Sequence, residues 1–399
     1  MILDNVQSDF GISETVNTSQ FFSYYPKYEY LDSMLGATQK KHINLFVDVK
    51  GCAPALYLEW GVKTILDYSK THNHISLHLF SAILQFIAFH KLYAAKRGIS
   101  VSFYFFMEQG KSKYHLNVYK GYKENRNIDD FFNLDLEDKE LLSKLLDKNY
   151  DICEYVINRI PKCYFYKLKF CEADFIPWYL MKYKIPQISV EESLNLIYSK
   201  DKDMHQCLSF PNTYQYYRAS YKDTSCLINE ESCFEHWFKT PCRKTDRAAD
   251  WFPLFLSMVG DSADGIPGIK GIGAKTIVKY LDDIFNVYGN DPDIMYSQCM
   301  SGSPILFESQ VSLKNKTMDK LFKNEKIIQR NMKLISYRAL SEYVNGDSYT
   351  LDAIEVKKYI DKICTNNEKL RSYSTLYESL QSKGLTDMID EKTCETCFL

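Results

Sequence analysis

The chain has 399 residues, 45% of them hydrophobic, so it can bury one large core or two smaller ones, and disorder is excluded for most of its length. Its formal net charge is −2, which excludes a uniformly basic nucleic-acid-binding protein and requires any phosphate-binding surface to come from local clusters. The twelve cysteines are scattered, and no apolar run is long enough to span a bilayer, so we expect reduced thiols in a cytoplasmic protein without a membrane segment. Cys394 and Cys397 form a single CxxC pair, which favours a frayed tail over a zinc site.

Residues 1–41 are polar and show no clear period, and we interpret them as an N-terminal extension. Four apolar runs then have the length and composition of buried parallel strands, and residues 75–96 carry apolar side chains at helical spacing, as expected of a crossover helix. We therefore predict an α/β fold with a mostly parallel sheet. The four predicted strands are residues 43–47, 101–107, 164–168 and 194–198.

Carboxylates follow these strands. Asp48 ends the first, Glu108 ends the second, and Asp201 and Asp203 follow the fourth, while Glu172 and Asp174 open the helix after residues 164–168. Open α/β sheets place their ligands at the carboxyl ends of the strands, so we expect these six side chains to meet at one edge.

The stretch from 259 to 276 organises the rest of the chain. It begins with Asp261 and Asp264, three residues apart, whose alternative role is to cap a helix. A glycine-rich hairpin follows, in which Gly268, Gly271 and Gly273 allow positive φ and close backbone approach to a phosphate. Basic side chains add charge on that side, namely Lys270, Lys275 and Lys279.

Residues 111–126 form a basic, aromatic stretch. Tyrosines alternate there with cations, which suits an unpaired nucleic-acid strand because bases stack on rings while cations follow the backbone. The alternative is a solvated surface helix. The basic residues are Lys111, Lys113, Lys120, Lys123 and Arg126, against one acid, Glu124, and the rings are Tyr114, Tyr119 and Tyr122.

Eight carboxylates at one sheet edge could not all stay ionised without cations, because like charges at short range repel. Two Mg²⁺ ions about 4 Å apart would resolve this and would support in-line displacement at a phosphodiester. The predicted metal ligands are Asp48, Glu108, Glu172, Asp174, Asp201, Asp203, Asp261 and Asp264.

Taken jointly, these motifs resemble the 5′-nuclease (flap endonuclease) family, over residues 43–290 and more faintly to 386. The matching segments are Asp48 after the first strand, Glu108-x-Gly-Lys-Ser, Tyr122-Lys-x-Asn-Arg, Glu172-Ala-Asp, Asp201-x-Asp, and Gly260-Asp-x-x-Asp before a hairpin similar to the family's helix–three-turn–helix element. Three departures are visible: Glu108 stands where the family usually has Asp, Phe175 replaces a second Asp, and His115 replaces a basic residue.

The resemblance implies a PIN-like core at 42–255 with an arch at about 109–160, a DNA-binding element at 256–290 and a helical region at 291–399. It implies a Mg²⁺-dependent 5′→3′ exonuclease and flap endonuclease, RNase H-like, that removes RNA primers or 5′ flaps during DNA replication, as in bacteriophages. Mn²⁺ would substitute for Mg²⁺, and K⁺ would bind at the hairpin. Lys123 and Arg126 would contact the scissile phosphate. DNA would be held by Lys111, Lys113, Tyr122, Gly268, Lys270, Gly271, Gly273 and Lys275.

The implied partners are branched or flapped DNA and RNA–DNA duplex, together with a single-strand-binding protein or sliding clamp, for a monomer in the cytoplasm of a host bacterium. Two other functions stay open. The chain could be a noncatalytic branched-DNA-binding protein whose cluster is spoiled at Glu108, or a sequence-indifferent RNase of the PIN-like fold, which would not need the hairpin.

Overall fold

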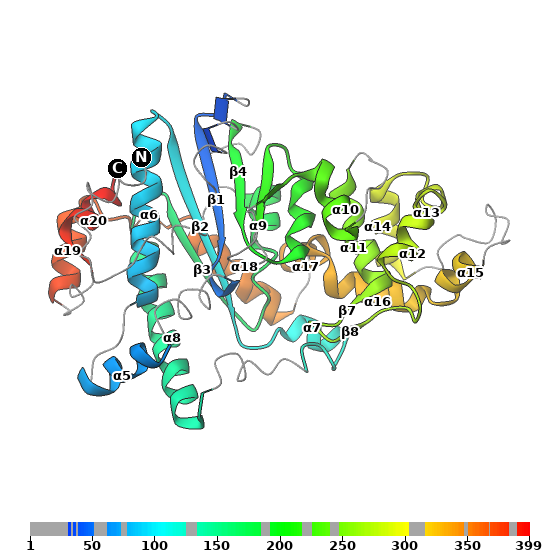
Figure 1. Ribbon diagram of the computed structural model, residues 1–399, viewed down its shortest axis with the longest axis horizontal. Helices are drawn as coiled ribbons and strands as arrows, with labels where there is room; N and C mark the ends of the chain where they lie inside the picture. The colour runs from blue at the N-terminus through cyan, green and yellow to red at the C-terminus, as the bar shows by residue number, and fades with distance from the viewer. Residues whose placement is uncertain are drawn as a thin grey trace.

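A computed structural model of the chain describes residues 31–32, 35–36, 39–51, 62–72, 78–124, 134–184, 192–217, 226–239, 247–302, 316–346, 350–366, 368–382 and 389–399. A six-stranded sheet in the order β3-β2-β1-β4-β5-β6 forms its centre, and all neighbours are parallel except β5 and β6 (Figure 1). The predicted mostly parallel sheet is confirmed. The strands are β1 His42–Asp48, β2 Ser100–Gln109, β3 Cys163–Lys169, β4 Leu194–Tyr198, β5 Thr213–Tyr217 and β6 Cys226–Ile228.

The register of the sheet brings the strand ends to one edge. Asp48 of β1 lies opposite Phe106 of β2, and Glu108 of β2 lies opposite Leu168 of β3. On the other side of β1, Val47 pairs with Tyr198, the last residue of β4. The residues that directly follow these strands therefore share the carboxyl edge.

Helices cover both faces, so the strands are apolar on both sides, as expected of parallel strands. Leu45 of β1 and Phe103 of β2 face one helical layer, while Phe46 and Tyr104 face the other. The first layer contains α5 Val62–His72, α6 His78–Lys96, α8 Leu136–Ile157, α19 Tyr373–Ser382 and α20 Glu391–Thr396. The second contains α9 Ile176–Tyr179, the π-helix η2 Leu180–Lys184, α17 Tyr337–Asn345 and α18 Leu351–Cys364.

A helical lobe extends beyond β6 and packs around α11 Ala248–Val259, whose side chains are almost all buried (Figure 1). The 3₁₀ helix η4 Lys202–Ser209 joins this lobe to the sheet. A two-stranded hairpin, β7 Gly260–Asp261 with β8 Ile266–Pro267, projects from the end of α11. The other helices are α7 Lys113–Val118, α10 Glu230–Phe238, α12 Ala274–Lys279, α13 Leu281–Val287, α14 Pro292–Ser301, α15 Lys316–Lys323 and α16 Glu325–Ile335.

The expected frayed tail is wrong. Cys394 and Cys397 are fully buried, and the Cys397 thiol donates to the carbonyl of Leu84 in α6 at 3.4 Å. Apolar burial against α6 outweighs the entropy of the chain end, since α19 and α20 complete the same core as the first layer of helices. Part of the extension is also docked, because Asp32 accepts two hydrogen bonds from the Arg97 guanidinium.

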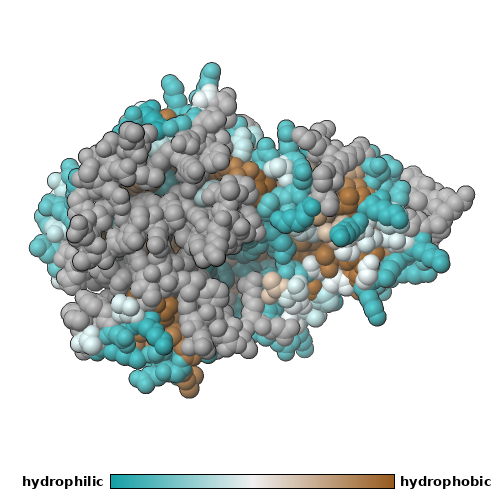
Figure 2. All heavy atoms as spheres, in the orientation of Figure 1, coloured by the Kyte–Doolittle hydropathy of each residue, from teal (hydrophilic) through white to brown (hydrophobic). Residues whose placement is uncertain are grey.

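Hydrophilic residues cover much of the described surface on the face drawn in Figure 2, with smaller hydrophobic areas between them. Within the described ranges, no helix combines the length and the apolar character needed to cross a bilayer.

Candidate active site

Asp48 lies at the centre of the carboxyl edge, where β1 ends. The Gly51 amide donates to its Oδ1 at 2.8 Å, and the Ser199 hydroxyl donates to its Oδ2 at 3.0 Å. Burial raises the pKa of Asp48 to about 6, and the charges of Glu108 and Asp201 add to the shift against the Gly51 hydrogen bond.

Glu108 is the second-last residue of β2 and is held by a lysine that the sequence interpretation did not consider. Lys50 Nζ donates to Glu108 Oε1 at 3.1 Å. Burial acts to raise the pKa of Glu108, but the ammonium groups of Lys50 and Lys123 outweigh it, and the pKa lies below its usual value. The side chain of Glu108, one methylene longer than that of the aspartate usual in the family, therefore forms an ion pair with Lys50.

Glu172 and Asp174 follow β3. Glu172 accepts a hydrogen bond from Lys123 Nζ at 2.5 Å, and burial still raises its pKa. Burial also raises the pKa of Asp174 well above its usual value, and the carboxylates of Glu108, Asp48, Asp201 and Glu172 each add to that shift. Asp174 is thus the point at which the acids of β1, β2, β3 and β4 meet.

Asp201 and Asp203 follow β4. Asp201 caps η4 by accepting from the Asp203 amide at 2.9 Å, and burial raises the pKa of both carboxyls. Asp203 Oδ1 is buried and has no hydrogen-bond partner in the part of the chain that the structure describes. An orphaned buried oxygen of this kind normally has an ion, water or ligand as its partner.

Asp261 ends β7, and Asp264 lies in the turn between β7 and β8. Lys202 Nζ donates to Asp261 Oδ2 at 2.7 Å, and the Ala263 amide donates to its Oδ1 at 2.9 Å. The Asp261 bond closes a tight turn, and α12 begins only at Ala274, so the alternative of a helix cap is wrong. Both carboxylates act on Asp201 and Asp203 and so join the same cluster.

Each of the eight predicted metal ligands therefore interacts electrostatically with at least one other, and three lysines oppose them. Among the described residues, no three His, Cys, Asp or Glu side chains converge tightly enough to hold a metal ion as they stand. Glu108, Glu172 and Asp261 are instead paired with lysines. The donors nonetheless fit a hard divalent cation, because they are all oxygen atoms and Asp203 presents an unpaired buried one.

Lys123 is the predicted phosphate contact that faces this cluster. Its backbone has a left-handed φ of 52°, and its amide donates to the Asp264 carbonyl at 2.8 Å, which fixes the segment against the hairpin. Arg126, the other predicted catalytic residue, lies outside the described residues.

Tyr122 does not offer its ring to a nucleic acid in this structure. It is 4% exposed and stacks on His115 with ring centroids 4.6 Å apart, and its hydroxyl donates to Asp264 Oδ2 at 3.2 Å. His115 is itself buried, and burial lowers its pKa to about 3, so it is a neutral core residue and does not supply the positive charge of the basic residue that it replaces. The expectation that Tyr122 contacts DNA directly is not supported by this geometry.

The other basic residues of the stretch differ in their surroundings. Lys111 is exposed, whereas Lys113 Nζ donates to Asp352 of α18 at 2.7 Å. The ion pair has both side chains at least 40% exposed, so it is screened by solvent and leaves Lys113 able to exchange partners. Phe175, which replaces an acid of the family, is fully buried against Tyr179.

The three predicted hairpin glycines, Gly268, Gly271 and Gly273, differ in backbone conformation and surroundings. Only Gly271 has a positive φ, of 76°, and it is exposed. A Cβ at Gly268 would clash with the backbone of Val259, so this residue allows the hairpin to pack on the end of α11. Gly273 precedes α12 with an extended backbone and has open space around it. Lys270, Lys275 and Lys279 are exposed beside them.

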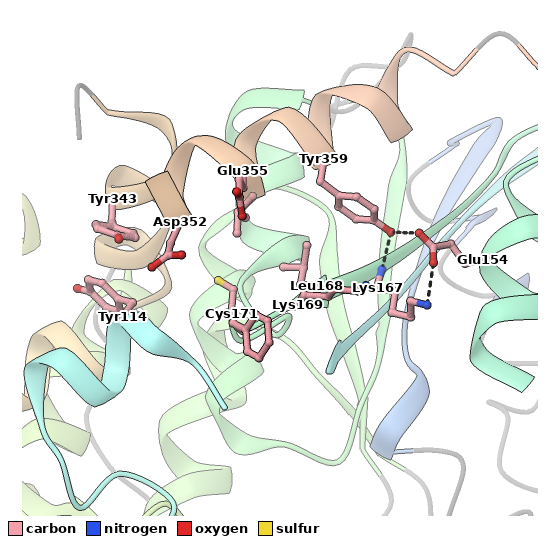
Figure 3. Close-up of a pocket in the computed structure, with 12 residues that line it drawn as sticks. Tyr114, Glu154, Lys167, Leu168, Lys169, Cys171, Tyr343, Asp352, Glu355 and Tyr359 are labelled. Carbon is pink, nitrogen blue, oxygen red and sulfur yellow. Dashed lines mark hydrogen bonds and ion pairs between the residues drawn. The ribbon is translucent and has the colours of Figure 1, made fainter. Parts of the chain in front are cut away.

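A cavity of about 370 Å³ lies under α18 beside the end of β3 (Figure 3). None of the eight acids lines it, although Cys171 of its wall adjoins Glu172. Lys167 and Tyr359 are bound to Glu154 at one end, and Asp352 and Glu355 add negative charge at the other. Because none of the clustered acids reaches it, the cavity is not part of the candidate site.

Sequence interpretation missed Lys50 and Lys202. Both stand within two residues of a predicted ligand, Lys50 after Asp48 and Lys202 between Asp201 and Asp203. That spacing was a usable signal, because a lysine next to a crowded carboxylate cluster is well placed to pair with it.

Comparison with known proteins gives partial matches in sequence and a longer match in structure. No protein-family model matches the chain. Over 98 residues, 24% of this chain, the sequence is 32% identical to a 5'-3' exonuclease of Buchnera aphidicola subsp. Acyrthosiphon pisum (strain APS), and over 87 residues, 22% of this chain, it is 38% identical to DNA polymerase I of Rhizobium leguminosarum. The matches span only 30% and 7% of those two proteins.

Two solved structures resemble the chain over most of its length. The D15 protein of T5 with metal ions has a TM-score of 0.50 and 18% identity, and T5 5'-exonuclease with bound zinc has a TM-score of 0.50 and 16% identity. Each comparison covers 80% of this chain and 98% of the other. The resemblance to the 5′-nucleases that the motifs indicated is confirmed, and the chain has the fold of T5 5'-exonuclease.

We predict that Asp203→Asn stabilises the metal-free protein at pH 7.5. The pKa of Asp203 is raised by burial and by its neighbours, so its ionised form destabilises the fold above the unfolded-state pKa. We expect the free energy of unfolding in EDTA to rise by about 0.5 to 2 kcal/mol. The gain should shrink as pH falls and the native carboxyl takes up its proton. Comparing variant with wild type by urea unfolding at each pH cancels the contribution of the buried histidines. A destabilised variant at pH 7.5 would contradict the assignment of repulsion as the dominant force.

Proposed function

We propose that this chain is a metal-dependent, structure-specific nuclease that hydrolyses phosphodiester bonds as a 5′→3′ exonuclease and flap endonuclease. One observation carries the proposal: carboxylates from the ends of the strands and from the hairpin meet at a single edge, together with Lys123. Such a cluster is costly to a fold unless cations bind it, so its presence points to the chemistry of a divalent metal.

Two Mg²⁺ ions are the cations we propose, with Mn²⁺ as a substitute. The residues that would hold them are the eight acids already described, of which Asp203 has a buried oxygen without a partner. When bound, the ions would supply an activated water and neutralise charge on the reacting phosphate. The chain's own residues bind and orient the substrate around that centre.

Lys123 is the residue we propose to contact the scissile phosphate, with Arg126 as its companion. Lys123 Nζ lies on Glu172, and the side chain is only 13% exposed, so the ammonium is held in a partly dehydrated setting. There its charge would interact strongly with negative charge that builds on the phosphoryl oxygens. Lys50 would be available for the same phosphate once a metal takes its place on Glu108.

The hairpin would hold duplex DNA. Exposed Lys270 and Lys275 flank Gly271, whose positive φ and missing side chain allow the backbone to approach phosphate closely. Gly268 and Gly273 shape the same turn, and K⁺ would bind at this hairpin as the family resemblance implies. Lys111 and Lys113, at the base of the arch, would follow the unpaired 5′ strand.

The substrates we propose are branched or flapped DNA and RNA–DNA duplex. Removal of RNA primers or 5′ flaps during the replication of a bacteriophage genome, in the cytoplasm of its host, is the process that such an activity would serve. A single-strand-binding protein or sliding clamp would recruit the enzyme, which we propose to be a monomer.

A noncatalytic branched-DNA-binding protein is a second candidate, favoured by one observation. Lys50 forms an ion pair with Glu108, the residue at which this chain departs from the family pattern. Lys123 and Lys202 form ion pairs with two other predicted ligands, Glu172 and Asp261. If these ion pairs persisted in the presence of Mg²⁺, the metal would lack ligands. A PIN-like RNase without duplex binding is less favoured, because residues 268–273 form the glycine-rich turn that leads into α12.

The central test is cleavage of a 5′-labelled flap duplex. Wild type should cut with Mg²⁺ and stop with EDTA. Asp201→Asn combined with Asp203→Asn should lower the single-turnover rate by roughly 10²- to 10³-fold or more, since charge stabilisation at the phosphate is lost. Branched-DNA binding should remain measurable in Ca²⁺. Wild type that binds the flap but never cuts it, with Mg²⁺ or Mn²⁺, would establish the binding protein instead.

Glu108→Asp tests whether the longer acid is adapted to its surroundings. The carboxylate would retreat by about one bond length from Lys50, and a misplacement of about 1 Å at a catalytic centre costs roughly 10²-fold in rate. We expect slower single-turnover cleavage and a higher Mg²⁺ requirement. Glu355→Asp, on an exposed glutamate outside the cluster, is the matched control. A faster Glu108→Asp enzyme would mean that Glu108 impairs the site.

Lys270→Ala with Lys275→Ala tests the hairpin. If each lysine neutralises one phosphate, the slope of log K against log salt for duplex binding should become less steep by about 2. Affinity for a single strand should change little. Lys392→Ala, an exposed lysine of α20 at the other end of the molecule, should leave both unchanged (Figure 1). An equal loss for duplex and single strand would contradict the duplex role.

A further inference from the structure

The segment that carries Lys123 is bonded to the hairpin. We define residues 119–124 as the arch foot. The Lys123 amide donates to the Asp264 carbonyl at 2.8 Å, and the Tyr122 hydroxyl donates to the Asp264 carboxylate at 3.2 Å. A Cβ on Gly265 would lie 3.0 Å from the Gly121 carbonyl, so the two backbones are also in direct contact. The arch foot can therefore move little unless the hairpin moves with it.

Helix α16 holds the hairpin from its other side. Asn331 is fully buried, and its Nδ2 donates to the carbonyls of Ser257 at 2.8 Å and Pro267 at 2.9 Å. These bonds tie the end of α11 and the second hairpin strand to α16. The helix also reaches the arch, since the Leu334 carbonyl is 2.9 Å from His115 Nε2, the ring on which Tyr122 stacks.

Arg330 joins these two sets of contacts. Its Nε and Nη2 donate to Asn331 Oδ1 at 3.1 and 2.8 Å, which orients the amide that holds Pro267. Its guanidinium lies over the Tyr119 ring, 4.7 Å from the centroid, at the start of the arch foot. One side chain thus contacts both the group that fixes the hairpin and the first ring of the arch foot.

We propose that Arg330 is a positioning residue that couples the duplex-binding hairpin to Lys123. A duplex bound to Lys270 and Lys275, in the glycine-rich turn directly after β8, would constrain the β7–β8 hairpin. Arg330 and Asn331 would pass that constraint to the arch foot, and so to the Lys123 ammonium at Glu172. Lys123 itself has a left-handed backbone, a conformation that persists only where surrounding contacts impose it. The inference deepens the proposed nuclease function and rests on it.

The physical logic is that of two discrete arrangements joined by rigid contacts. Buried hydrogen bonds such as those of Asn331 do not stretch continuously, so a shift of the hairpin is passed on or resisted as a unit. In an enzyme built this way, a duplex bound at residues 270–275 would stabilise the position of Lys123 that these contacts define. Branched DNA would then be cut in preference to a single strand of the same sequence.

Arg330→Met and Tyr119→Leu test the coupling. Each should lower the single-turnover rate on a flap duplex by roughly 3- to 10-fold, the range expected when a partly buried cation–π contact is lost. Duplex affinity in Ca²⁺ should change less than about twofold, because neither group is assigned a phosphate. Tyr119→Phe keeps the ring and should match wild type. Arg330→Lys keeps the charge but not the two bonds to Asn331, and should recover only part of the rate.

Epistasis separates positioning from a merely structural role. In a Lys123→Ala background, Arg330→Met should cause little further loss, since the residue it positions is gone. The rate on a single-stranded substrate should respond less than the rate on the flap duplex. Losses that multiply with Lys123→Ala, or a loss confined to salt-dependent affinity, would overturn the proposal, the latter by making Arg330 a phosphate contact.

Amide hydrogen exchange gives a readout that needs no cleavage. Adding flap duplex with Ca²⁺ should slow exchange at Tyr122 and Lys123 in wild type but not in Arg330→Met, while the hairpin amides are protected in both. Wild type that cuts DNA while Arg330→Met behaves identically overturns the coupling alone. Wild type that binds and shows the linked protection but never cuts overturns the nuclease function and leaves the linkage standing. Wild type that neither binds nor cuts overturns both.

Discussion

Repulsion among eight carboxylates at one edge of the sheet is the constraint on which the rest of the structure depends. Burial raises the pKa of Asp48 to about 6 and also raises the pKa values of Glu172, Asp174, Asp201 and Asp203. The ionised forms of these carboxyls therefore destabilise the folded state at this edge. Ammonium groups relieve part of the strain at Glu108, Glu172 and Asp261. The remaining negative charge is what a divalent cation would neutralise.

Local backbone hydrogen bonds hold the acids in place against this repulsion. Asp48 is held by the Gly51 amide, Asp201 by the Asp203 amide and Asp261 by the Ala263 amide, each within three residues. Such short loops cost little chain entropy to close, so one oxygen of each of these three acids is oriented by its own turn. Distant groups bind the second oxygen of two of them, Ser199 at Asp48 and Lys202 at Asp261. Asp203 lacks such a bond at Oδ1, and this is the atom that most needs an external partner.

Sequence periodicity predicted the parts of this arrangement that depend on local chain properties. The strand at residues 194–198 coincides with β4, and the acids at the carboxyl ends of β1 and β2 and after β4 reach one edge because parallel strands end together. Ion-pair partners that are distant along the chain could not be predicted; the Asp352 that binds Lys113, for example, is 239 positions away. The burial of Tyr122 could not be predicted either. Its place in a basic stretch suggests an exposed ring, but the ring is buried by contacts with His115 and Asp264. The prediction of a frayed C-terminal tail was wrong because the sequence near residue 394 does not show that α6, about 300 residues earlier, supplies the surface on which the tail packs.

The cluster lies on the seam between the sheet and the helical lobe. Asp48, Glu108, Glu172 and Asp174 belong to the sheet, whereas Asp261 and Asp264 belong to the hairpin, and Lys202 reaches across from η4 to Asp261. Neither part alone holds the full set of donors. On the proposed function, cations bound at the seam would draw the hairpin towards the sheet, and a duplex on the hairpin would bear on the geometry of the same seam. The same contacts would then respond both to the structure of the substrate and to metal binding. The preference for branched DNA would follow because some of the acids belong to the sheet and others to the hairpin.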